Sequence, residues 1–148
     1  MVTLSVATAN AIVDATTRRL DGGVLRLYTG VRPATAEVAV GRQTPLAALG
    51  LGVPAFLPAL DGSADAHPLT PDPSAAGGGT ATWFRAWSAA GDAVLDGSVG
   101  LTRAAADLAG VAWTASDLML PVVLIQAGMT VAVTAWRHTQ PLREGAAS

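Results

Sequence analysis

The chain has 148 residues, enough for one domain with a sizeable core but not for two. Only 14% of its residues are charged, 51% are apolar, and cysteine is absent, which excludes disulfides and thiolate metal sites. The formal net charge of -2 gives no field that would attract nucleic acid. So few charges favour a chain that buries part of its surface against other subunits.

The first predicted element is an amphipathic helix over residues 4–20, where apolar residues recur at helical spacing. Thr3 or Ser5 could cap its start, and the Gly22-Gly23 pair supplies a stop. The residues expected on or near its apolar stripe are Val6, Ile12 and Val13. Asp14 interrupts the run where a signal peptide would have its apolar core, so export by that route is not indicated.

Two short strands follow, over residues 24–29 and 46–51. Alternation places Leu25 and Leu27 on one face of the first strand and Arg26 and Tyr28 on the other. Residues 61–79 then form the longest predicted loop, rich in proline and glycine, which we expect to reach toward a neighbour.

The centre of the chain is a predicted hairpin of strands 80–88 and 93–99. A register that pairs Ser88 with Ala93 sets Trp83 opposite Ser98, Arg85 opposite Asp96 and Trp87 opposite Val94. The opposite face collects the apolar side chains and is expected to be core. We therefore expect an open surface where two tryptophans flank an ion pair. The candidate interface residues on it are Trp83, Arg85, Trp87 and Asp96.

The last third of the chain is harder to assign. Residues 103–109 could form a short helix that ends at Gly110. Residues 118–136 carry no charge and are long enough for a membrane helix, but Pro121, a predicted turn at 126–128 and alternating apolar residues argue against one. We expect two strands instead, over 117–125 and 129–138, and no membrane partner.

These elements predict a mainly β fold: a β-sandwich or jelly-roll-like domain with one N-terminal α-helix. Residues 1–148 are expected to form a single domain. Within it we distinguish an N-terminal helix or arm (1–22), the long loop (61–79) and a frayed tail (140–148).

No residue pattern indicates catalysis or a cofactor. His67 and His138 would need a third metal ligand such as Asp65 or Asp72, at no recognised ligand spacing, and solvated histidines are the better interpretation. The aspartate pairs 92/96 and 61/65 are better explained by turns and by the ion pair to Arg85. We therefore expect a protein that is not an enzyme and binds neither metal nor cofactor.

Nucleophile and phosphate motifs also give no site. There is no Gly-x-Ser-x-Gly motif, and the 77–79 glycine run lacks the lysine of a phosphate-binding loop. Tryptophans could stack on sugars or nucleotides, although core packing and protein interfaces are commoner roles. The four tryptophans are Trp83, Trp87, Trp113 and Trp136.

Several segments together resemble a group of small structural proteins of tailed bacteriophages. They are an N-terminal helix; Gly22-Gly23-Val24-Leu25-Arg26-Leu27-Tyr28-Thr29-Gly30 followed by Pro33-Ala34-Thr35-Ala36; Ala81-Thr82-Trp83-Phe84-Arg85 leading to Asp96-Gly97-Ser98-Val99-Gly100; and Asp117-Leu118-Met119-Leu120 with Ile125, Gly128 and Val131. The likeness covers most of the chain but rests on turn and packing residues. The chain departs from the pattern in extra residues from 101 to 116.

The resemblance implies a virion component, made in the host cytoplasm and placed on the capsid surface as a head decoration or cement protein. Its implied partners are the major capsid protein and further copies of itself, in a homodimer or other symmetric oligomer, without nucleic acid. A tail or neck component is the first alternative, and a carbohydrate-binding module that uses Trp83 or Trp87 is the second.

Overall fold

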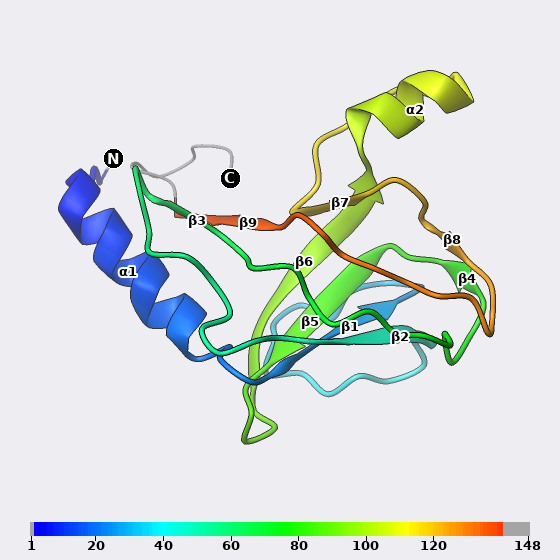
Figure 1. Ribbon diagram of the computed structural model, residues 1–148, viewed down its shortest axis with the longest axis horizontal. Helices are drawn as coiled ribbons and strands as arrows, with labels where there is room; N and C mark the ends of the chain where they lie inside the picture. The colour runs from blue at the N-terminus through cyan, green and yellow to red at the C-terminus, as the bar shows by residue number, and fades with distance from the viewer. Residues whose placement is uncertain (1, 141–148) are drawn as a thin grey trace.

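The computed structural model describes residues 2–140, so the predicted frayed tail lies outside the described residues from 141 onward. The chain is mainly β, with a helix at its start and a curled five-stranded sheet (Figure 1). Along the sheet the strand order is β2-β1-β5-β6-β7. The bounds are β1 Val24–Tyr28, β2 Pro45–Gly50, β5 Trp83–Trp87, β6 Ala93–Leu101 and β7 Leu118–Leu120.

The β5–β6 hairpin at the centre of the sheet follows the predicted register over most of its length. Arg85 lies opposite Asp96 and Trp83 opposite Ser98, which confirms both pairings. Trp87 pairs with Ala93, and the expected pairing with Val94 is wrong. A β-bulge at this point adds one unpaired residue to β6, a shift that side-chain alternation does not reveal.

Helix α1 (Val6–Arg18) is shorter than the predicted range 4–20, and Ser5, one of the two predicted caps, begins it. The Ser5 hydroxyl accepts a hydrogen bond from the Thr8 amide at 3.1 Å. Its buried residues are Ala9, Val13 and Thr17, spaced four apart along one stripe. Val6 and Ile12, expected on or near that stripe, are 43% and 39% exposed. The buried stripe therefore consists of Val13 between the small residues Ala9 and Thr17, and Val6 and Ile12 are partly exposed.

Helix α1 and the turn that follows it are fastened to residues 55–62 by side chains that accept hydrogen bonds from backbone amides. The pairs are Asp21 with the Ala55 amide at 2.8 Å, Asp14 with Ala59 at 2.9 Å and Asn10 with Gly62 at 2.7 Å. This spacing of acceptors fixes how the extended segment crosses the helix.

One face of the sheet is covered by a second layer, which we define as residues 52–78 and 121–139. In it β3 (Ser63–Asp65) pairs with β9 (Arg137–Thr139). Its β8 (Leu124–Ile125) pairs with β4 (Gly79–Thr80), which directly follows residue 78. The segment predicted as a long loop is thus tied to the end of the chain, for example by the Asp72 amide, which donates to the Val131 carbonyl at 2.9 Å.

The predicted strands 117–125 and 129–138 form only in pieces, as β7, β8 and β9. Pro121 lacks a backbone donor and follows the end of β7 directly. The turn before residue 129 is present, with Gly128 at φ 87°. The predicted short helix is also present as α2 (Arg103–Ala109), capped by Thr102 and ended by Gly110 in the left-handed conformation. Among residues 2–140, neither helix has the length and apolar character needed to cross a bilayer.

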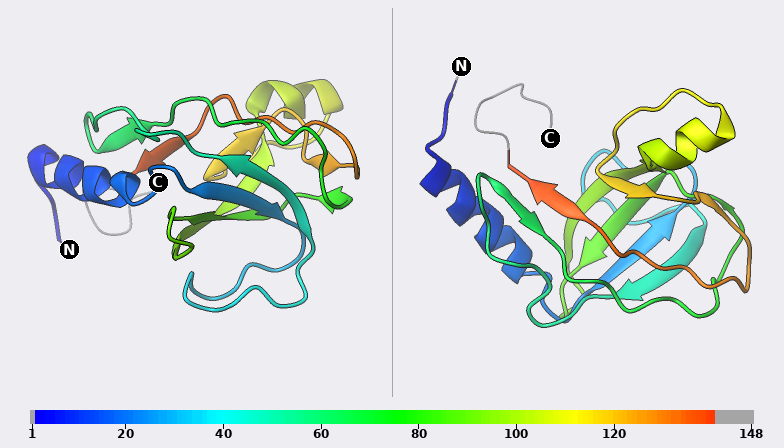
Figure 2. Two further views of the ribbon diagram at one scale, coloured as in Figure 1. Left: turned by 60° about the horizontal axis from the view of Figure 1, so that its bottom comes forward. Right: turned by 45° about the horizontal axis from the view of Figure 1, so that its top comes forward.

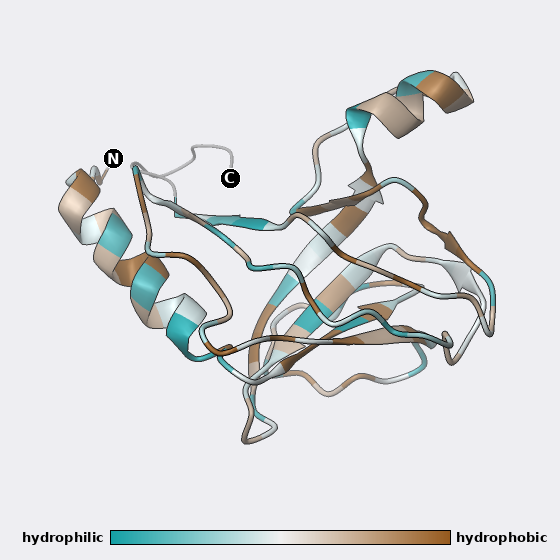
Figure 3. Ribbon diagram, in the orientation of Figure 1, coloured by the Kyte–Doolittle hydropathy of each residue, from teal (hydrophilic) through white to brown (hydrophobic). Residues whose placement is uncertain are grey.

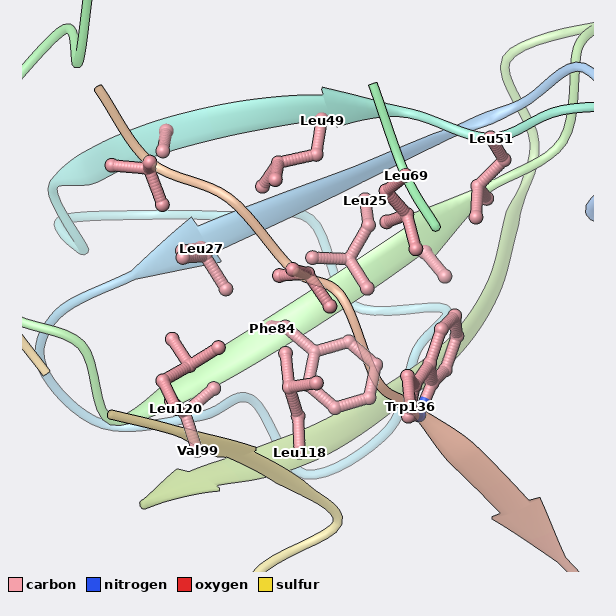
Figure 4. Close-up of a cluster of buried hydrophobic side chains, with 14 of the residues drawn as sticks. Leu25, Leu27, Leu49, Leu51, Leu69, Phe84, Val99, Leu118, Leu120 and Trp136 are labelled. Atoms are coloured by element: carbon pink, nitrogen blue, oxygen red, sulfur yellow. The ribbon is translucent and has the colours of Figure 1, made fainter. Parts of the chain in front are cut away.

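The core lies between the sheet and the second layer (Figure 4). The Phe84 ring packs against Trp136 at 5.3 Å in an edge-to-face arrangement, so a sheet side chain meets one from the second layer. Gly97, opposite Phe84 on β6, leaves room for this ring, because an added Cβ would collide with Phe84 Cε1 and Cζ. Both layers therefore meet at Phe84.

Candidate functional site

The face of β5 that the sequence marks as an interface is buried within the chain. Trp83 and Arg85 are each 1% exposed, and the Asp96 side chain is 7% exposed. What covers this face is a strap, which we define as residues 30–43. Figure 2 shows the strap (cyan) and the second layer on opposite faces of the sheet. The expectation of an open surface is therefore wrong.

Arg85 joins the sheet to the strap. Its Nε and Nη2 donate to the two Asp96 carboxylate oxygens at 2.6 and 2.9 Å. Its Nη1 donates to the Val38 carbonyl at 2.7 Å, and Nη2 also reaches the Thr35 carbonyl at 3.3 Å. The bond to Asp96 raises the pKa of Arg85 above its usual value, although burial opposes this. The predicted ion pair thus forms, and its arginine also holds the strap.

Aromatic rings flank this ion pair. Trp83 stacks on Tyr28 with ring centroids 4.4 Å apart, and the Arg85 guanidinium lies 5.6 Å from the rings of both Trp83 and Trp87. Arg26 covers Trp87 at 5.5 Å. Because Trp83 is buried, it offers no face on which a sugar could stack. Trp87 is half-buried, and Arg26 lies over its ring.

The other two tryptophans have separate roles. Trp136 is 4% exposed and belongs to the core. Trp113 is 36% exposed, donates from Nε1 to the Leu101 carbonyl at 3.1 Å and lies under Arg103 at 5.4 Å.

The residues weighed as metal ligands do not converge. Asp65 forms a bidentate pair with Arg137 at 2.8 and 3.2 Å, and Asp72 accepts from the backbone amides of Ala48 and Ser74. Within the described part of the chain, no three histidine, aspartate or glutamate side chains are grouped so that they could hold a metal ion.

A groove of about 910 Å³ lies between β6 and the 134–139 segment, at a position the sequence did not indicate. Phe84, Leu95 and Trp136 form its apolar part. Its titratable lining residues are Asp65, Asp96, Asp117, Arg137 and His138. They come from β3, β6, the start of β7 and β9, so only the folded chain brings them together.

Burial lowers the pKa of His138 below 6.5, and the nearby Asp117 carboxylate opposes this only in part. The folded chain therefore binds fewer protons here than the unfolded chain. The stabilising contribution is fully present above pH 6.5 and is lost as the pH falls through the folded-state value.

We expect wild-type protein to lose more stability between about pH 7.5 and about pH 5.5 than the His138→Gln variant, in urea unfolding at each pH. Asp65 has a pKa lowered from 3.8 by the Arg137 bond, so its effect falls below this window. Equal losses in the two proteins would show that His138 is not held in its neutral form.

Figures 1 and 3 place helices α1 and α2 at opposite ends of the domain. Exposed apolar residues occur on both helices and on the segments joined to them, as well as at Val31 and Val38 of the strap. The α1 end comprises Val6, Ile12, Val53, Leu57 and Leu60, and Leu60 is 73% exposed. The α2 end comprises Leu108, Val111, Trp113, Val122 and Leu124, and Leu108 is 92% exposed. Helix α2 buries only Ala106, so most of its surface is open.

Comparison of the chain with protein families, with curated proteins and with solved structures finds no match.

Proposed function

We propose that this chain is a non-enzymatic structural protein of a tailed-bacteriophage virion. Its role would be that of a head decoration or cement protein that binds the major capsid protein lattice. The sequence resemblance motivates the proposal, and the two exposed apolar ends carry it, since a protein that clamps neighbouring subunits needs two separate contact surfaces.

The expected binding free energies favour many copies that each bind weakly at two contact surfaces. Each Å² of apolar surface removed from water contributes about 25 cal/mol, so side chains as exposed as Leu60 and Leu108 have much to gain from a partner. Contacts at both ends act together, because the first contact raises the effective concentration of the second. Many copies would thereby oppose the outward pressure of packaged DNA.

The remaining features of the proposal follow from this role. The chain would be made in the host cytoplasm, assemble on the capsid surface and pair with itself in a symmetric oligomer. We also propose that the sheet and the second layer form a β-sandwich or jelly-roll-like arrangement; the core shared by Phe84 and Trp136 supports two packed layers.

Purified protein should cosediment with heads that lack it and saturate at a lattice-related stoichiometry. Leu108→Asp and Leu60→Asp should each weaken binding at least about tenfold, because each places a charge in an apolar contact. The matched control is Val31→Asp, at an 82% exposed position on the strap, which should bind as wild type does.

Two results would contradict the proposal. Failure of the wild-type chain to bind heads would exclude a decoration role. Binding at a single vertex or along the tail would assign the chain to the tail or neck instead.

A further inference from the structure

Strand β6 has an open edge beside the groove. On one side it pairs with β5, but on the other β7 reaches only Val99–Leu101. At Ser98 the backbone amide donates to the Asp117 carboxylate at 2.9 Å. Within residues 2–140, therefore, the stretch 93–97 has no strand on this side.

The backbone of this stretch is oriented to accept another strand. The Val99 amide donates to the Thr82 carbonyl at 3.0 Å, so Val99 faces β5. Because alternate residues of an antiparallel strand face the same neighbour, Leu95 and Gly97 also face β5. The amide and carbonyl of Asp96 consequently point into the groove, as expected for an edge that takes an extended chain.

The groove holds one carboxylate whose arginine partner is distant, that of Asp117. Asp65, Asp117 and Arg137 bring their charges to the groove, whereas the Asp96 carboxylate is turned to Arg85 on the strap face, and burial keeps His138 neutral near pH 7. Asp65 and Asp96 have bidentate arginine partners. Asp117 is 42% exposed and its arginine partner, Arg32, is 4.0 Å away, so it is the carboxylate most available to a lysine or arginine from outside.

We propose that an extended segment of the neighbouring shell protein adds to the open edge of β6 and places a lysine or arginine beside Asp117. This inference rests on the proposed function and names how the partner is held. Apolar side chains of the segment would pack on Phe84, Leu95 and Trp136, while its backbone pairs with Asp96. A small molecule in the groove would contact the same apolar side chains but would leave the backbone of β6 without a partner strand.

The test compares binding of variants to heads that lack the chain. Ala135 is exposed and lines the groove, whereas Ala132 is exposed on the same segment outside it. Ala135→Arg should weaken binding at least about tenfold, because it fills the groove and repels a basic segment. Ala135→Glu also adds a long side chain, somewhat shorter than arginine, with the opposite charge, and should weaken binding by less than about threefold. Ala132→Arg should bind as wild type does.

Hydrogen exchange gives the second readout. In head-bound protein the Asp96 amide should exchange at least about tenfold more slowly than in free protein.

Four results would overturn part or all of the account. If wild type binds heads without protection of Asp96, and Ala135→Arg has no effect, the groove assignment is wrong while the cement role stands. Equal weakening by Ala135→Arg and Ala135→Glu overturns the basic segment. Protection of Asp96 in concentrated free protein would make a second copy the occupant, and failure of wild type to bind heads overturns both proposals.

Discussion

Replacing Arg85 with methionine is expected to lower the free energy of unfolding by about 3–5 kcal/mol. The change removes both hydrogen bonds to Asp96 and leaves that carboxylate buried without its partner. It also releases the Thr35 and Val38 carbonyls of the strap. Urea unfolding measures the loss, and limited proteolysis should show earlier cleavage within residues 30–43.

The chain contains its own control for this prediction. Arg137 and Asp65 form a second bidentate pair, but their side chains are 66% and 52% exposed. Arg137→Met should therefore change the unfolding free energy far less than Arg85→Met does, because solvent screens an exposed pair. Adding Asp96→Leu to Arg85→Met should restore part of the loss, since no unpaired charge remains. Equal effects of Arg85→Met and Arg137→Met would contradict the role of the buried pair.

Phe84→Ala is expected to cost about 3–5 kcal/mol of unfolding free energy. Phe84 is 1% exposed and its ring packs on Trp136 across the two layers. Its truncation removes apolar contacts and leaves a cavity that Gly97 has no side chain to fill.

The control for Phe84 is Leu124→Ala, since Leu124 is 57% exposed on β8. It should change stability by less than about 0.5 kcal/mol. Thermal or urea unfolding of both variants distinguishes the two positions. A loss of under about 1 kcal/mol in Phe84→Ala would mean that the layers do not depend on this contact.

Rules that depend only on nearby residues correctly predicted helix caps, strand faces and the central ion pair. The serine cap begins α1 at residue 6, and Gly110 ends α2. Strand alternation gave the buried leucines of β1, and opposed charges gave the pairing of Arg85 with Asp96. In each case the signal lies within a few residues of the structure that it specifies.

The burial of the Trp83–Arg85 face could not be predicted this way. Its cover is the strap, which has no periodic pattern, buries none of its own side chains and binds Arg85 through backbone carbonyls, which every residue has. Alternation separated the two faces of the hairpin correctly. It could not show that both faces are covered.

The groove had no signal in the sequence, because its walls come from segments far apart in the chain. The sequence raised Asp65 and His138 as candidate metal ligands and Asp96 as an interface residue, and tertiary packing alone brings the three to one groove. The two apolar ends were only partly indicated: low charge predicted exposed apolar surface but not its position on helices α1 and α2.

Electron cryo-microscopy of heads saturated with the purified chain tests the cement proposal most directly. We expect density at lattice positions over the whole head, with the α1 end and the α2 end on different neighbouring subunits and with continuous density along β6 at residues 93–97. Density at one vertex only, or heads without added density, would contradict the account.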